Sequence, residues 1–200
     1  NLYVRLKAEN GWVNMRSKPG TYHNEAGGGT GSVRVDKIWY TFPLGERWEA
    51  TVGPRIENYY MLAATPSVYK PGVLKAFKLG GHSSAFGAST STGAGLKYEA
   101  DNGFATSITV NSKGAAGASG LLTDEDENKV NTMVDYTADK YHISATYSKQ
   151  HNGWDAWSYY ATTDAASDSA IDSADAYALR AWWRPEETGT AVPSISVGYD

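Results

Sequence analysis

The chain of 200 residues carries 18 basic and 22 acidic residues, and its net charge of −4 excludes the positive excess typical of nucleic-acid binding. Cysteine is absent, which excludes disulfides, thiol nucleophiles and Cys-ligated zinc. No window reaches 18 consecutive apolar residues, so no transmembrane helix is expected. Asn1 begins no signal peptide, so we expect a mature or truncated chain.

The amounts of aliphatic and aromatic residues point to an unusual kind of sheet. Ile, Leu, Val and Phe together supply only 32 residues, whereas there are 7 tryptophans and 14 tyrosines. The small net charge and the aromatic content do not fit a disordered chain. This composition suits a large barrel, which covers a lipid-facing surface and has no solid interior to fill.

Nine segments alternate apolar and polar residues with a period of two, which predicts β-strands. The clearest is Arg47–Glu57, where the apolar Trp48, Val52 and Ile56 are at even positions and the charged Arg47 and Glu49 at odd ones. We call the alternating set of apolar positions in a strand its apolar parity and the other set its polar parity. In the second segment the alternation slips near Lys37, which predicts a β-bulge. In chain order the segments are Leu2–Ala8, Ser32–Phe42, Arg47–Glu57, Leu96–Ala100, Phe104–Asn111, Val130–Thr137, Tyr141–Gln150, Ala176–Arg184 and Ala191–Tyr199.

The connections between these segments are alternately long and short, as in an antiparallel up-and-down transmembrane β-barrel with short periplasmic turns and long external loops. Nine strands are an odd number, and Ser194–Tyr199 still alternates where the sequence stops. We therefore expect residues 1–200 to be part of one barrel domain. The long connections are 9–31, 58–95, 112–129 and 151–175; the short ones are 43–45, 101–103, 138–140 and 185–190.

Alternation alone also fits a soluble sandwich or barrel with its apolar face inside. The placement of aromatic residues distinguishes the two, because six rings on the apolar parity lie beside the short connections. Amphipathic rings at one level of an apolar face predict a membrane-interface girdle. The six girdle residues are Trp48, Tyr98, Phe104, Tyr136, Tyr141 and Trp183.

Five stretches resemble the major outer-membrane porins of cyanobacteria, which are related to carbohydrate-selective porins. They are Asp36–Pro43 with Val52–Arg55, then Met61–Ala63 with Pro66–Tyr69, and Val192–Gly198. The resemblance implies a homotrimeric passive pore for small hydrophilic solutes and inorganic ions, in the outer membrane among lipid and lipopolysaccharide; some members are labelled iron-uptake porins. It also implies contact with cell-wall polymer, but only through an N-terminal domain that these residues do not contain.

Charged residues on the polar parity are expected to line the pore and to select solutes by field and size. The other interpretation of this parity is the solvated outer face of a soluble β-protein. Arg55 is the preferred single candidate, because it ends a strand where the longest connection begins; it could equally hold that connection through Glu57. The predicted pore-lining residues are Arg34, Asp36, Arg47, Glu49, Arg55, Glu57, Lys97, Glu99, Arg180 and Arg184.

The longest connection, residues 58–95, exceeds the length of an ordinary loop. In porins such a loop can fold into the lumen and narrow it, and the resemblance implies a similar role here. The other interpretation is a cover over the external mouth. Side chains that could line the narrowing are Tyr59, Tyr60, Tyr69, Lys70, Lys75 and Lys78.

No motif indicates an enzyme, a cofactor or a metal. The acidic run 124–127 matches no cation-binding loop, and the histidines form no pair at metal-ligand spacing. The glycines of 27–31 lack the Gly-Lys-Ser/Thr of a phosphate loop, and no Gly-x-Ser-x-Gly turn is present. We therefore expect a porin; the alternative is a soluble or surface carbohydrate-binding β-protein, whose sugars would stack on the aromatic residues.

Overall fold

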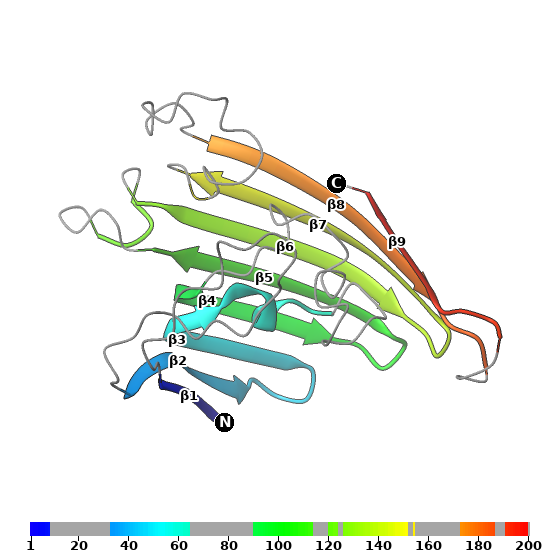
Figure 1. The fold of residues 1–200 in the computed structure, drawn as a ribbon, viewed down its shortest axis with the longest axis horizontal. Coiled ribbons are helices and arrows are strands. Elements are labelled where there is room, and N and C mark those ends of the chain that lie inside the picture. The colour runs from blue at the N-terminus through cyan, green and yellow to red at the C-terminus, as the bar shows by residue number, and fades with distance from the viewer. Residues whose placement is uncertain are drawn as a thin grey trace.

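The computed structural model describes residues 1–8, 33–64, 90–113, 120–123, 126–151, 154, 173–186 and 191–199. In this part of the chain nine strands form one sheet in the order β1 to β9, and each strand pairs antiparallel with the next (Figure 1). The all-β, up-and-down prediction is thus confirmed. The strands are β1 Leu2–Ala8, β2 Val33–Pro43, β3 Trp48–Glu57, β4 Thr90–Glu99, β5 Phe104–Ser112, β6 Asn128–Thr137, β7 Tyr141–His151, β8 Ser173–Trp183 and β9 Ile195–Tyr199.

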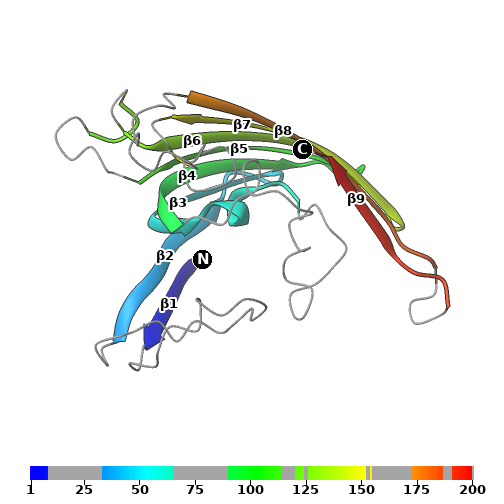
Figure 2. The same cartoon turned by 45° about the horizontal axis from the view of Figure 1, so that its top comes forward.

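The sheet is strongly arched, with β1 and β2 descending at one side and β9 at the other (Figure 2). It is not closed into a barrel, because β1 and β9 are its two edge strands. A 3₁₀ turn, η2 Asn58–Met61, follows β3 and lies within the arch. Across the described ranges, no helix has the length and apolarity to cross a membrane.

The two faces of the sheet differ sharply in exposure, as β7 illustrates. Ile143 is 59% exposed, whereas its neighbour Ser144 is only 3% exposed, and this alternation continues along most of the strand. Leu62, directly after η2, packs on Met133 and Ala178, so the face with the buried polar residues is the one inside the arch. We call it the concave face and the opposite one the convex face.

Two bulges shift which side chains share a face. In β2, Arg5 lies opposite Lys37 and Leu6 opposite Val35, so Asp36 is the extra residue, close to the predicted slip at Lys37. The second bulge, between Gly53 and Ile56 of β3, was not expected.

The bulge in β3 corrects the expected parity of that strand. Arg55 lies opposite Ile38, which in turn lies opposite the exposed Val4, so Arg55 belongs to the convex face. Ile56 is fully buried and packs with Trp39 on the concave face, not beside Val52. One inserted residue reverses a period of two, which the sequence pattern alone concealed.

The structure also corrects two strand boundaries. β4 begins at Thr90, six residues before the predicted Leu96, because its first half consists of small residues that carry no alternation. β9 begins at Ile195 and not at Ala191, consistent with the missing N–H of Pro193, which cannot donate to a ladder.

Candidate functional site

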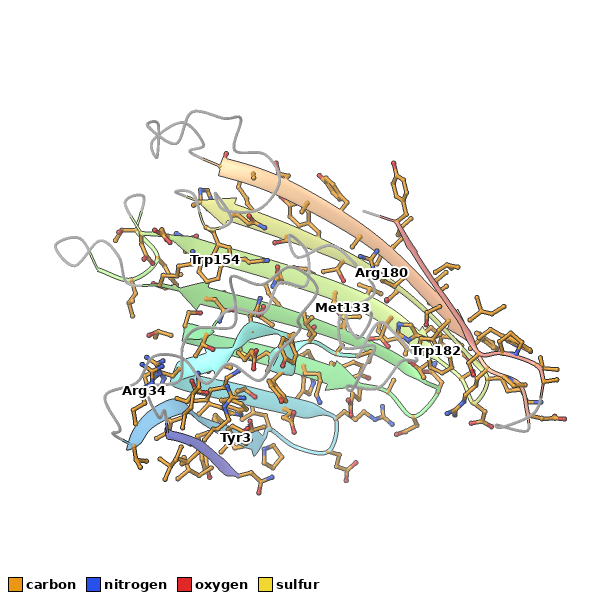
Figure 3. All side chains as sticks on the ribbon, viewed as in Figure 1. Tyr3, Arg34, Met133, Trp154, Arg180 and Trp182 are labelled. Atoms are coloured by element: carbon orange, nitrogen blue, oxygen red, sulfur yellow. The ribbon has the colours of Figure 1, made fainter. Side chains whose placement is uncertain are left out.

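The concave face is lined mainly by polar side chains, and its two halves differ in chemistry. Tyr3 and Arg34 mark the β1–β2 end, whereas Met133, Arg180 and Trp182 mark the β6–β8 end (Figure 3). We call β1–β4 the ion-paired half and β5–β7 the hydroxyl-amide half.

In the ion-paired half, most of the predicted charged residues are joined to one another. Arg5 pairs with Asp36 of the adjacent strand. Lys37, which is buried, pairs with Glu57. The Lys97 ammonium lies 3.1 Å from Glu49 Oε1 and 3.2 Å from Glu99 Oε1. Opposite charges in contact cancel much of each other's electric field. At distances of more than a few ångströms from these pairs, the net field of this half is therefore small.

The hydroxyl-amide half has almost no ion pairs and many buried polar atoms without a hydrogen-bond partner in the described part of the chain. Leaving such an atom unsatisfied costs about 1–3 kcal/mol, so water or a solute is expected to hydrate this face. The side chains concerned are Thr109, Asn111, Asn131, Asp135, His142, Ser144, Thr146 and Ser148.

Residues 58–64 cross the concave face and are held there by three contacts. Met61 packs with Trp39 and Ile56. Leu62 packs on Met133 and Ala178. The Ala63 N–H donates to Ser107 Oγ at 2.9 Å. This segment is the start of the connection that we expected to fold inward.

Glycine makes room for this segment. A Cβ at Gly95 would lie 2.8 Å from Met61 Cβ, closer than real Cβ atoms approach. A Cβ at Gly93 would similarly meet the Asn111 amide at 2.6 Å. The small residues that left the first half of β4 without an alternating pattern are therefore the ones that allow Met61 and Asn111 to approach the strand closely.

Four aromatic rings fasten the beginning of the segment to β1 and β2. Tyr3 stacks on Trp39 with ring centroids 4.0 Å apart, and Tyr60 lies 5.2 Å from Trp39 and 4.7 Å from Tyr59. Burial, reinforced by the neighbouring Tyr60, raises the pKa of the Tyr59 hydroxyl to about 12.

The Ser107 contact yields a first prediction. Ser107→Ala leaves the Ala63 N–H without its acceptor, so we expect a loss of about 1 kcal/mol in the free energy of unfolding. Thr109→Val on the same strand and face is the control, because Thr109 Oγ1 has no partner. Urea titration of the detergent-solubilised protein measures both. Equal effects of the two substitutions would mean that the hydrogen bond contributes nothing.

The six predicted girdle aromatics all lie on the convex face, on or beside strand ends near the short turns. Trp48 lies opposite Tyr98, with centroids 4.9 Å apart; Phe104 lies opposite Tyr136. Tyr136 and Tyr141 are 6.0 Å apart, and Tyr141 lies opposite Trp183. The rings thus form a row across the strands, at the end of the sheet where the short turns lie.

The predicted pore-lining residues are divided among three places. Arg47 and Arg184 lie at the turn edge, where Arg47 pairs with Asp101 and Arg184 Nε donates to Asp139 O at 2.7 Å. The hydrogen bond with Tyr98 and the Asp101 carboxylate raise the pKa of Arg47 above its ordinary value. Arg55 is on the convex face, where its Nε donates to Asp36 O at 2.9 Å. On the concave face lie Arg34, Asp36, Glu49, Lys97, Glu99 and Arg180. Glu57 is the last residue of β3 and pairs with the buried Lys37.

Of the predicted constriction residues, Tyr59 and Tyr60 lie in η2. Tyr69, Lys70, Lys75 and Lys78 lie outside the described residues. In the acidic run, Asp126 Oδ2 accepts a hydrogen bond from the Leu122 N–H at 2.8 Å, and Glu127 pairs with Lys113 at 2.8 Å. These contacts are local and hold the connection between β5 and β6.

Sequence reasoning missed the neutral side chains of the hydroxyl-amide half, because it selected charged residues. Their signal was present in the sequence, since Ser144, Thr146 and Ser148 recur at a period of two and alternate with Ile143, Ala145 and Tyr147. Within the described ranges no three His, Asp or Glu side chains come together as metal ligands. No protein-family model matches the chain, and neither a curated protein nor a solved structure matches it.

Proposed function

We propose that this sheet is part of the wall of an outer-membrane β-barrel porin. The concave face lines a water-filled pore for passive diffusion of small hydrophilic solutes and inorganic ions, and the convex face contacts lipid. The protein acts as a channel and not as an enzyme.

The observation that carries this proposal is the inverted burial of the sheet. Apolar side chains of the middle of the strands are the exposed ones, as at Ile108, Val134, Ile143 and Leu179, each at least 45% exposed. Their buried strand neighbours on the other face are mostly polar, and the apolar ones, Met133 and Ala178, are those on which Leu62 packs. In water this arrangement is unfavourable, because apolar side chains are exposed to solvent and polar ones are buried. Between lipid and an aqueous lumen it is favourable, because the apolar face contacts lipid and the polar face contacts water.

The convex face of β7 has the dimensions of a membrane band. Its residues are Tyr141, Ile143, Ala145, Tyr147 and then the charged Lys149. From Tyr141 to Lys149 the strand rises about 26 Å, which a tilt of about 40° reduces to roughly 20 Å, close to the apolar height of known barrels. Tyr147 contacts Tyr177 at 5.1 Å between ring centroids, which supports a second aromatic level opposite the girdle.

A lipid-embedded sheet has to pair every backbone group of its edges. Strands β1 and β9 are both edges here, so a pore of this kind requires further strands that join them. Residues 58–64, fixed to the concave face, would narrow such a pore beside the ion-paired half.

The resemblance of the sequence to cyanobacterial porins supports a homotrimer in the outer membrane, surrounded by lipopolysaccharide. A soluble carbohydrate-binding β-protein remains the second candidate, and the exposed ring of Tyr60 on the concave side would suit it. That candidate leaves the exposed aliphatic band without a role.

The purified protein is expected to conduct ions across a planar lipid bilayer and to migrate on gels as an oligomer that heating converts to monomer. The first result follows from an aqueous lumen, and the second from a closed β-sheet that resists detergent. A freely soluble monomer without conductance would instead support the carbohydrate-binding candidate. Reversal potentials across a salt gradient then give the ion preference.

A further inference from the structure

Asp135 of β6 differs from the acidic residues of the ion-paired half. It is only 4% exposed, yet its Oδ2 has no hydrogen-bond partner. Its Oδ1 accepts a long hydrogen bond of 3.4 Å from Thr137 Oγ1. No ion pair to Asp135 occurs in the described part of the chain. A buried carboxylate is stable when a cation or several donors compensate its charge.

The nearest basic groups are engaged elsewhere. Lys97 acts on Asp135 through its field but forms its ion pairs with Glu49 and Glu99. Arg180 lies two strands away along the same row, and its Nη1 donates to the carbonyls of Leu179 and Tyr199 at 2.8 and 2.9 Å.

Two further unpartnered polar atoms lie beside Asp135 on the concave face. Ser144 is its directly opposite residue on β7, and the Ser144 hydroxyl has no partner. His142, one position further along that face of β7, is 2% exposed, and its Nε2 has no partner either. Directly opposite residues in an antiparallel pair have Cβ atoms about 5 Å apart, and diagonal ones about 7 Å.

The hydrogen bonds of Thr137 accommodate the imidazole tautomer that leaves Nε2 free to bind a metal. The Thr137 hydroxyl lies 2.8 Å from His142 Nδ1, and when it donates its proton to Asp135 Oδ1 its lone pair accepts the proton of Nδ1. The Nε2 of a neutral imidazole held in this way carries a lone pair and can bind a metal. Stacking on Trp182, at 5.7 Å and 8° between planes, keeps the ring in this orientation.

We infer that Asp135, His142 and Ser144 form a subsite on the pore wall for a permeating divalent cation that accepts imidazole and carboxylate ligands, such as Zn²⁺ or Ni²⁺. With one carboxylate, one imidazole and one hydroxyl, water completes the coordination shell, so binding is weak and exchange fast. Thr137 is a positioning residue that orients the imidazole through its second nitrogen. This inference rests on the proposed function, because the cation enters from the aqueous lumen.

The test is calorimetric titration of ZnCl₂ into the detergent-solubilised protein, together with Zn²⁺ inhibition of the current in planar bilayers. Asp135→Asn and His142→Gln should each weaken binding at least about tenfold and relieve the inhibition in parallel, and Thr137→Val should weaken binding about tenfold. His151→Gln, at the far end of the same strand, is the matched control and should bind like the parent. The heat-dependent gel shift verifies the fold of each variant.

Equal Zn²⁺ affinity of the parent, Asp135→Asn and His142→Gln would overturn the subsite, even if the protein conducts. Binding that depends on both residues in a protein without conductance would support the subsite and reject the pore. A conducting parent that binds no Zn²⁺ up to millimolar concentration would reject the subsite alone.

Discussion

Ile143→Lys is expected to destabilise the protein folded in lipid vesicles by about 1–3 kcal/mol, because a lysine on the lipid face of a barrel costs about 2–4 kcal/mol at the bilayer midplane and about 0–1 kcal/mol near the interfaces. Ile143 lies on the convex face of β7 between the aromatic Tyr141 and Tyr147, two residues from the first and four from the second. A lysine there has to leave water for hydrocarbon or bend toward a distant interface. The heat-dependent gel shift after urea-dilution refolding into vesicles measures the folded fraction.

Ser144→Lys, one residue further along, is the matched control and should destabilise the folded protein less than Ile143→Lys does. The Ser144 side chain lies on the concave face directly opposite Asp135, so a lysine there can pair with the Asp135 carboxylate. In a soluble protein the order would be reversed, because the exposed Ile143 would accept a lysine and the buried Ser144 would not. Tolerance of the first substitution with loss of folding in the second would therefore refute the membrane assignment.

The period of two was sufficient to predict nine strands, because each strand places one kind of side chain on each face, and the alternating lengths of the connections predicted their antiparallel order. It also placed Trp48 and Tyr141 on the apolar face beside the turns, where the structure has them. A pattern of this kind is strong wherever large residues alternate with polar ones.

The same rule failed wherever the chain departs from a regular ladder. The bulge in β3 reversed Arg55 and Ile56, although nothing in the residue types announces an extra residue. The start of β4 was missed because Gly93 and Gly95 contribute no side chain to the pattern, and their role depends on Asn111 and Met61, distant in sequence.

The candidate site was only partly predictable for a related reason. Charge in the sequence indicated the ion-paired half, but it could not show that Lys97 is neutralised by its neighbours. The unpartnered state of Asp135 depends on which residues lie opposite it on β5 and β7, and therefore on strand register. Register is a property of the assembled sheet and not of one segment.

Gly95→Val is expected to detach residues 58–64 from the concave face. The added side chain would collide with Met61, and overpacking of this kind costs about 1–3 kcal/mol, which favours the detached segment about 5- to 160-fold. Ala94→Val is the control, because Ala94 is exposed on the convex face beside Val52 and has room for two methyl groups.

Two measurements follow the detachment. In the parent, comparing ultraviolet absorbance titrations with and without Tyr59→Phe should isolate a tyrosine with a pKa near 12. The raised pKa means that the phenolate is disfavoured in the packed segment, so attachment is fully stable below pH 10 and weakens as the pH rises toward 12. In Gly95→Val this pKa should return toward 10.

In planar bilayers the current through Gly95→Val should become noisier and its mean should change, whereas Ala94→Val should behave like the parent. The current responds because the segment lies beside the ion-paired half, on the face assigned to the lumen. An altered Tyr59 pKa with an unchanged current would place the segment away from the conduction path. An unchanged pKa would show that the segment does not need the space above Gly95, and the narrowing would then have to lie elsewhere in the connection.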